Sequence, residues 1–133
     1  MNGWLAQDLG HYNEVLQWGE CETPKAEGAT AVIKVKAIGL NFPDILAIAG
    51  KYQVKSKPPF VPGQEAMGEV VEAGPESSFR VGERVMTMNA GGAFAEYMLA
   101  PEVASFRVPD NMSDEDAAAF QMIYQTSYFG LKI

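Results

Sequence analysis

The chain has 133 residues, 47% of them hydrophobic, so it can bury the core of one globular domain and leaves little room for a second. Its 17 acidic and 10 basic residues give a formal net charge of -7 without a dense basic block, which argues against nucleic acid as a partner. The single cysteine excludes an internal disulfide, and the absence of a signal-like start or of an apolar run of roughly 18 residues predicts a cytoplasmic protein without a membrane partner.

Glycine and proline recur at short intervals along the chain, which favours strands over long helices. Residues 31–38 are the strongest strand, because Lys34 and Lys36 alternate with the apolar Ile33 and Val35. Further strands are expected at residues 65–73, 84–88 and 94–99, and residues 89–92 are interpreted as a tight hairpin between the last two. The pattern predicts a mainly β fold with short helices, arranged as a small barrel.

Short helices are expected in two regions. Pro43 in a first turn and Gly50 at the end predict a helix over residues 43–50, which Asn41 or Phe42 would precede. Ser113 is a good N-cap for a helix that continues through residues 117–120. A last helix is expected over residues 124–132, and it lacks a stop signal, which indicates a cut or a missing partner.

Four short motifs follow one another along the chain. They are Ala37-Ile38-Gly39-Leu40-Asn41-Phe42-Pro43-Asp44, Pro62-Gly63-Gln64-Glu65-Ala66-Met67-Gly68, Val81-Gly82-Glu83-Arg84-Val85 and Gly91-Gly92-Ala93-Phe94-Ala95-Glu96-Tyr97. In this order and spacing they resemble the N-terminal GroES-like domain of medium-chain dehydrogenase/reductases, and most closely the zinc-free quinone oxidoreductase branch. The resemblance implies a GroES-like, partly open β-barrel at residues 1–121. Residues 122–133 would then begin a connecting helix toward a Rossmann domain that the chain lacks.

The zinc alcohol dehydrogenases of the same superfamily are the nearest competing assignment. The resemblance puts their cysteine ligand at Asn41 and their histidine ligand at Gln64, and neither amide is a good zinc donor. Glu65 alone remains nearby, and it is interpreted as a hydrogen-bonded structural carboxylate. The sequence therefore predicts no metal and no zinc.

The resemblance also assigns site residues. Asn41 would contact the cofactor or substrate and could hold a ribose hydroxyl, a carboxamide or a substrate carbonyl, while the simpler alternative is a helix N-cap. Tyr52 matches a tyrosine that lines the nicotinamide site and acts as a proton donor in related enoyl thioester reductases, so it is the catalytic candidate and also a cofactor contact. Its alternative is an ordinary loop tyrosine that packs over the barrel.

Tyr124 and Thr126 fall where the family's chain passes from the barrel toward the cofactor domain, and both are candidate cofactor contacts. The equal alternative is a helix with an aromatic stripe on its buried face. Lys51, Lys55 and Lys57 could attract a phosphate-bearing substrate, although a solvated loop is the favoured interpretation.

Nucleotide binding in the family depends on a glycine-rich turn after a strand, and the chain contains no G-x-G-x-x-G element. The first hypothesis is the N-terminal substrate domain of an NADPH-dependent quinone oxidoreductase-like reductase, which acts on a small-molecule quinone or enone and is inactive alone. It predicts an exposed apolar patch over residues 124–133. The alternative is a stand-alone, non-catalytic GroES-like binding or assembly module, which could be a homo-oligomer.

Overall fold

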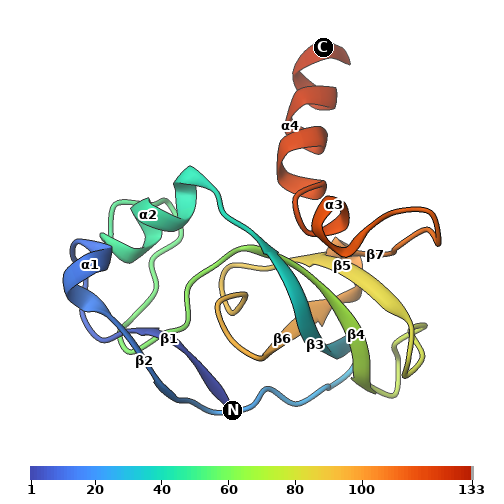
Figure 1. The fold of residues 1–133 in the computed structure, drawn as a ribbon, viewed down its shortest axis with the longest axis horizontal. Coiled ribbons are helices and arrows are strands. Elements are labelled where there is room, and N and C mark those ends of the chain that lie inside the picture. The colour runs from blue at the N-terminus through green and yellow to red at the C-terminus, as the bar shows by residue number, and fades with distance from the viewer. Residues whose placement is uncertain (133) are drawn as a thin grey trace.

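The computed structural model describes residues 1–132, which form two antiparallel sheets and several short helices (Figure 1). Strands β1 (Asn2–Ala6) and β2 (Leu16–Glu20) pair with each other, and helix α1 (Tyr12–Val15) lies between them in the chain. The second sheet has the order β6-β3-β4-β5-β7. Its strands are β3 (Thr30–Gly39), β4 (Glu65–Ala73), β5 (Arg84–Met88), β6 (Tyr97–Pro101) and β7 (Ser105–Arg107).

Four helical segments accompany the larger sheet. They are α2 (Phe42–Ile48), the 3-10 turn η1 (Glu102–Ala104), α3 (Asp114–Ala118) and α4 (Gln121–Lys132). The two sheets remain open, and β1 also makes isolated bridges from Gly3 to Ala95 and from Ala6 to Phe60, which lie in segments that precede β6 and β4. The predicted fold class, mainly β with short helices in a partly open barrel, is confirmed.

Two clusters of apolar side chains form the core. One lies within the larger sheet around Ile33, Val70, Val85 and Met98, and the other packs strands β4 and β5 against α3. The alternation predicted in β3 is present at Lys34 and Lys36, which are exposed, but Val32 is buried beside Ile33. A register shift between these two residues interrupts the strict alternation of faces.

The predicted hairpin at residues 89–92 is wrong. Strand β5 pairs with β4 and β7, whereas β6 pairs with β3 at the opposite edge of the sheet. The segment between them crosses the molecule, with the Gly92 N–H donating to Val61 O at 2.8 Å and Trp4 N–H donating to Phe94 O at 2.8 Å. Long-range pairing therefore decides the partners, and β6 begins at Tyr97 rather than at residue 94.

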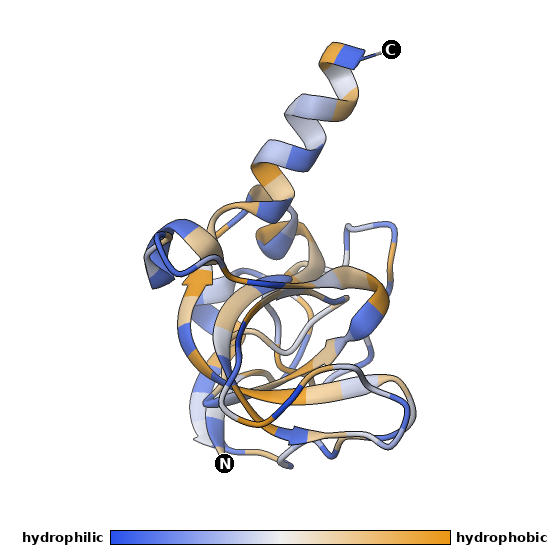
Figure 2. Cartoon of the chain, turned by 90° about the vertical axis from the view of Figure 1, so that its right-hand side faces the viewer, coloured by the Kyte–Doolittle hydropathy of each residue, from blue (hydrophilic) through white to orange (hydrophobic). Residues whose placement is uncertain are grey.

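Helix α4 stands away from the barrel (Figures 1 and 2). It begins three residues before the predicted helix, and Gln121 is its one buried residue among those described. Ser113 caps α3 as predicted, because its hydroxyl accepts from Asp116 N at 3.1 Å. Within residues 1–132, no helix has the length and apolar character needed to cross a bilayer.

Candidate functional site

Asn41 lies at the point where β3 ends and α2 begins. Its extended backbone makes it the N-cap residue of α2, and Pro43 occupies the first turn, where a missing N–H costs no hydrogen bond. The Asn41 N–H donates to Asp44 Oδ2 at 2.8 Å, the arrangement in which an acidic residue three positions into a helix closes its start. The helix predicted over residues 43–50 is therefore confirmed, with Asn41 in the position that sequence patterning expects.

Glu65 is the buried carboxylate behind Asn41, and only 1% of its surface is exposed. Its Oε1 accepts from Asn41 Nδ2 at 2.8 Å, and its Oε2 accepts from the Met122 N–H at 3.0 Å. The Met122 N–H belongs to the first turn of α4, where helical N–H groups lack intrahelical partners and the helix dipole favours negative charge. Glu65 is thus hydrogen-bonded through both oxygens, as predicted, and it joins the start of α2 to the start of α4.

Gly39 supplies the space that this carboxylate needs. It lies opposite Glu65 across the β3–β4 pair. A Cβ on Gly39 would lie 2.3 Å from Glu65 Oε1 and 2.7 Å from Ala118 O, well inside ordinary contact. Steric room is the reason for glycine here.

Asp44 is a second buried carboxylate at this end of the sheet. It is 3% exposed, and its Oδ1 has no hydrogen-bond partner among the described residues. Burial raises the pKa of Asp44, backbone N–H groups including that of Asn41 oppose this rise, and the charge of Glu65 reinforces it. Asn41 therefore stands between two buried acidic side chains.

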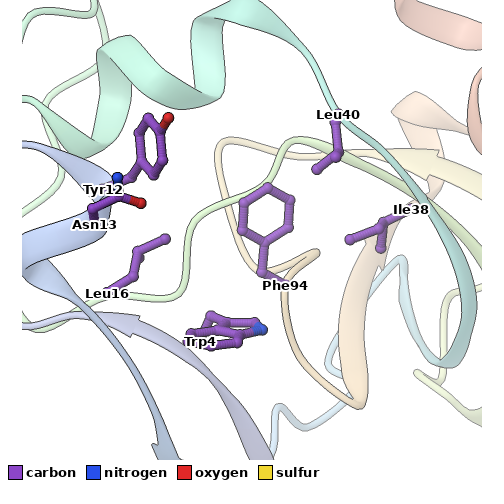
Figure 3. Close-up of a pocket in the computed structure, with 7 residues that line it drawn as sticks. All are labelled: Trp4, Tyr12, Asn13, Leu16, Ile38, Leu40 and Phe94. Atoms are coloured by element: carbon purple, nitrogen blue, oxygen red, sulfur yellow. The ribbon is translucent and has the colours of Figure 1, made fainter.

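An apolar hollow opens beside this cluster (Figure 3). It has a volume of about 460 Å³. Its walls are Trp4, Tyr12, Asn13, Leu16, Ile38, Leu40 and Phe94. An adjoining hollow shares several of these walls and extends along α2 to Asn41, Phe42, Asp44, Ile45 and Ile48. The two hollows form one largely apolar surface, and the hollow along α2 also includes the polar residues Asn41 and Asp44 in its lining.

Phe94 lies at the centre of this surface, between the side chains of β3 and those near the N-terminus (Figure 3). Gly63 makes its position available, because it has φ +94° and a Cβ there would lie 2.4 Å from the Phe94 ring. Phe94, which sequence patterning placed at the start of a strand after the supposed hairpin, thus delivers an aromatic ring to the hollow.

Residues 27–110 match the family described as the alcohol dehydrogenase GroES-like domain. The chain belongs to this family. The matched range contains Asn41, Glu65 and Phe94, and so includes most of the cluster and the centre of the hollow.

The GroES-like domain is similar to parts of longer proteins. It is 44% identical over 102 residues to a quinone oxidoreductase-like protein 2 homolog from Nematostella vectensis, a match that covers 75% of this chain and 28% of that protein. The human synaptic vesicle membrane protein VAT-1 homolog-like structure superposes with a TM-score of 0.94 at 33% identity, over 99% of this chain and 43% of its own.

The quinone oxidoreductase of Thermus thermophilus, which was also solved in complex with NADPH, superposes with a TM-score of 0.84 at 34% identity. That match covers 99% of this chain and 40% of the other. The predicted resemblance to quinone oxidoreductases of the medium-chain dehydrogenase/reductase superfamily is confirmed, and the GroES-like domain spans less than half the length of each of these relatives.

The four predicted site residues lie in different surroundings. Asn41 lines the hollow along α2, whereas Tyr52 is half-buried in the loop after α2 and lines neither hollow. Tyr124 is 60% exposed and stacks on Phe120 with ring centroids 4.9 Å apart. The exposed Thr126 donates its hydroxyl to Met122 O at 2.5 Å.

Within residues 1–132 both Tyr124 and Tyr128 are exposed, so the described part of the chain does not bury an aromatic stripe on α4. Sequence patterning missed Trp4, Tyr12 and Phe94 as walls of a hollow, because Phe94 is far along the chain from the N-terminal segments that contribute the other two. It also missed the bond between Glu65 and Met122, which joins residues 57 positions apart.

The zinc site of alcohol dehydrogenases does not fit the donors in this domain. Asn41 and Gln64 offer neutral amides, and both Glu65 oxygens already accept hydrogen bonds. Residues 1–132 contain no group of three or more histidine, cysteine, aspartate or glutamate side chains that could hold a metal ion. That the protein works without zinc stays a prediction.

Proposed function

We propose that this chain is the substrate domain of an NADPH-dependent reductase of the quinone oxidoreductase type. NADPH and a proton would convert a quinone to a hydroquinone, or an α,β-unsaturated carbonyl to its saturated form. The observation that carries the proposal is the largely apolar surface around Phe94, whose lining along α2 includes the polar residues Asn41 and Asp44. Such a surface suits a flat, conjugated molecule whose polar group lies at one end.

The residues of the domain would bind and orient rather than take part in covalent steps. Apolar walls such as Trp4 and Phe94 would exclude water and lie against the substrate ring. NADPH would supply the hydride. We assign Asn41 and Tyr52 to the nicotinamide end of the cofactor, and Tyr52 also to proton donation, because an amide can hydrogen-bond a cofactor group and a phenol can donate a proton.

Tyr124 and Thr126 complete the proposed cofactor contacts. Because the Thr126 hydroxyl donates its proton to Met122 O, it remains free only to accept a hydrogen bond. An N–H of the nicotinamide carboxamide is a suitable donor to it. The exposed Tyr124 ring offers a flat face for stacking.

We further propose that residues 1–121 are the substrate domain and that residues 122–133 begin the helix leading to a nucleotide-binding domain. Support comes from the exposed apolar residues of α4, the helix that stands away from the barrel in Figure 2. Exposure reaches 69% at Phe129 and 86% at Leu131. A surface of this kind suits burial against another part of a protein. Ile133, the end of the predicted patch, lies outside the described residues.

A chimera provides the direct test. This chain would replace the corresponding part of the Thermus thermophilus quinone oxidoreductase, to which it is 34% identical. We expect quinone-dependent or enone-dependent NADPH oxidation by the chimera, at least tenfold slower after Asn41→Ala, and none by the 133-residue chain alone. A folded chimera that binds NADPH but reduces neither substrate class would contradict the proposal.

A second experiment examines the hollow in the chain itself. Trp4 lines the hollow of Figure 3 and Trp18 does not, so Trp18→Phe leaves a reporter in the wall and Trp4→Phe leaves one outside it. Titration with 1,4-naphthoquinone is expected to quench Trp4 fluorescence saturably, and to quench Trp18 fluorescence saturably but less strongly, because the two ring centroids lie 5.6 Å apart and only Trp4 lines the hollow. Equal linear quenching in both variants would show that the hollow does not bind a quinone.

A further inference from the structure

Glu65 belongs to none of the functional assignments above, yet it contacts the one predicted site residue that lines the hollow. It accepts from the Asn41 side chain at 2.8 Å and from the Met122 N–H at 3.0 Å, and only 1% of its surface is exposed. A carboxylate of the sheet thus holds a side chain of the site and the first turn of α4 together.

The chemistry of the carboxylate sets the orientation of the Asn41 amide. An ionised carboxylate only accepts hydrogen bonds, so the Asn41 nitrogen must face Glu65 and the Asn41 carbonyl oxygen must point away from it. Asn41 lines the hollow along α2, whereas Glu65 does not. The oxygen is therefore the amide atom turned from Glu65, toward the start of α2, where it faces the Asp44 backbone N–H and keeps a second lone pair for a ligand.

Gly39 and Asp44 restrict the movement of the Glu65 carboxylate and of the Asn41 backbone. A Cβ at Gly39 would lie 2.3 Å from Glu65 Oε1, so the carboxylate is packed directly against the β3 backbone. Asp44 Oδ2 accepts the Asn41 backbone N–H at 2.8 Å, which holds the main chain of the same residue. Both the backbone and the side chain of Asn41 are thus held by buried acids.

We infer that Glu65 is a positioning residue, which holds the Asn41 amide with its oxygen toward the ligand and couples that orientation to the start of α4. The inference rests on the proposed function for its ligand. The inference deepens the proposed function, because an Asn41 oxygen that faces the ligand can bind only a ligand group that donates a hydrogen bond. Of the three groups that Asn41 could hold, a carboxamide N–H or a ribose hydroxyl fits, and a substrate carbonyl does not.

The test uses Glu65→Gln, which removes one negative charge, and its combination with Asn41→Asp, which preserves the formal charge. In Glu65→Gln, the introduced amide oxygen can still accept from Met122, but the introduced NH₂ group faces the NH₂ group of Asn41, and two donors cannot pair. Asn41 must then turn its oxygen inward. Adding Asn41→Asp restores an acceptor opposite that NH₂ group and again leaves an oxygen facing outward.

Three quantities would be measured on the ¹⁵N-labelled 133-residue chain. They are the thermal midpoint, the Asn41 side-chain NH₂ signals, and the affinity for dihydronicotinamide riboside, an uncharged probe that carries both the carboxamide and the ribose. We expect Glu65→Gln to move the NH₂ signals and to weaken binding about tenfold or more, which is about 1.4 kcal/mol. The double variant should recover binding to within about threefold of wild type.

A purely structural role would lower the thermal midpoint of Glu65→Gln while leaving the affinity unchanged, and that result would overturn the inference. A folded double variant without recovered binding, beside a wild type that binds, would also overturn it. If Glu65→Gln alone does not fold, recovery of both fold and binding in the double variant supports the inference. If the wild type binds no probe, the proposed function loses its support, and the NH₂ signals still decide whether Glu65 orients Asn41.

Discussion

Replacing Gly39 by alanine is expected to disrupt the link between Asn41, Glu65 and α4. The added Cβ would lie 2.3 Å from Glu65 Oε1 and 2.7 Å from Ala118 O, whereas real Cβ contacts essentially never fall below 3.0 Å. The Ala118 oxygen is a backbone atom and the carboxylate is held by two hydrogen bonds, so neither neighbour can move without loss.

The expected cost combines two effects. Overpacking a buried site costs about 1–3 kcal/mol, and losing a hydrogen bond to a buried charged group costs about 1.5–3 kcal/mol. Because the two effects overlap, we expect the free energy of unfolding to fall by about 3 kcal/mol in Gly39→Ala, with a drop in the thermal midpoint of roughly 10 °C.

Urea unfolding at neutral pH, followed by circular dichroism, measures this change. Gly130→Ala is the matched control, since Gly130 lies in α4 with no atom within 4 Å of the added Cβ. The control should be neutral or more stable by up to about 1 kcal/mol, because alanine favours a helix. A Gly39→Ala variant within about 0.5 kcal/mol of wild type would refute the steric argument.

Two further changes test the charged groups. Burial raises the pKa of Asp44 from 3.8, so the folded chain binds more protons than the unfolded chain above about pH 3.8. Unfolding experiments from about pH 3 to pH 7 should therefore show that wild type loses stability relative to Asp44→Asn as pH rises. A stability difference that stays constant with pH would contradict this. Arg84 donates to Asp114 Oδ1 at 2.7 Å and to Met112 O at 2.8 Å. Arg84→Lys should therefore lower the free energy of unfolding in urea by about 1–2 kcal/mol, which is less than for a fully buried ion pair because both side chains are partly exposed. Arg107→Lys is the control, and it should lower the free energy of unfolding by under about 0.5 kcal/mol because the Arg107 side chain is 52% exposed. An equal loss of stability in the two variants would contradict a special role for Arg84.

Local patterns predicted the individual elements well. The strands at residues 65–73 and 84–88 have the predicted bounds, and the helix beside Asn41 begins within a residue of its predicted start. Ser113 caps α3 as expected. These features follow from residues that are neighbours in the chain, since the period of two, proline in a first turn and an N-cap hydroxyl all act over a few residues.

Strand partners were harder to predict than the strands themselves. Residues 89–92 have the glycines of a hairpin, but β7 occupies the edge of β5 to which β6 would have to pair. A short link with two glycines is compatible with a hairpin and with a crossing segment alike. The pairing energy of whole strands, summed across the sheet, decides between them.

The candidate site, like the fold, was predictable from the sequence only in its local features. Four motifs in order were enough to identify the family and to select Asn41, because residue types and their spacing can be read directly from the chain. Only the tertiary structure brought Trp4, Leu16 and Phe94 into one hollow and turned the Asn41 amide toward Glu65. Those relations join segments that are distant in the chain, and they depend on how sheets and helices pack, which short-range patterning does not specify.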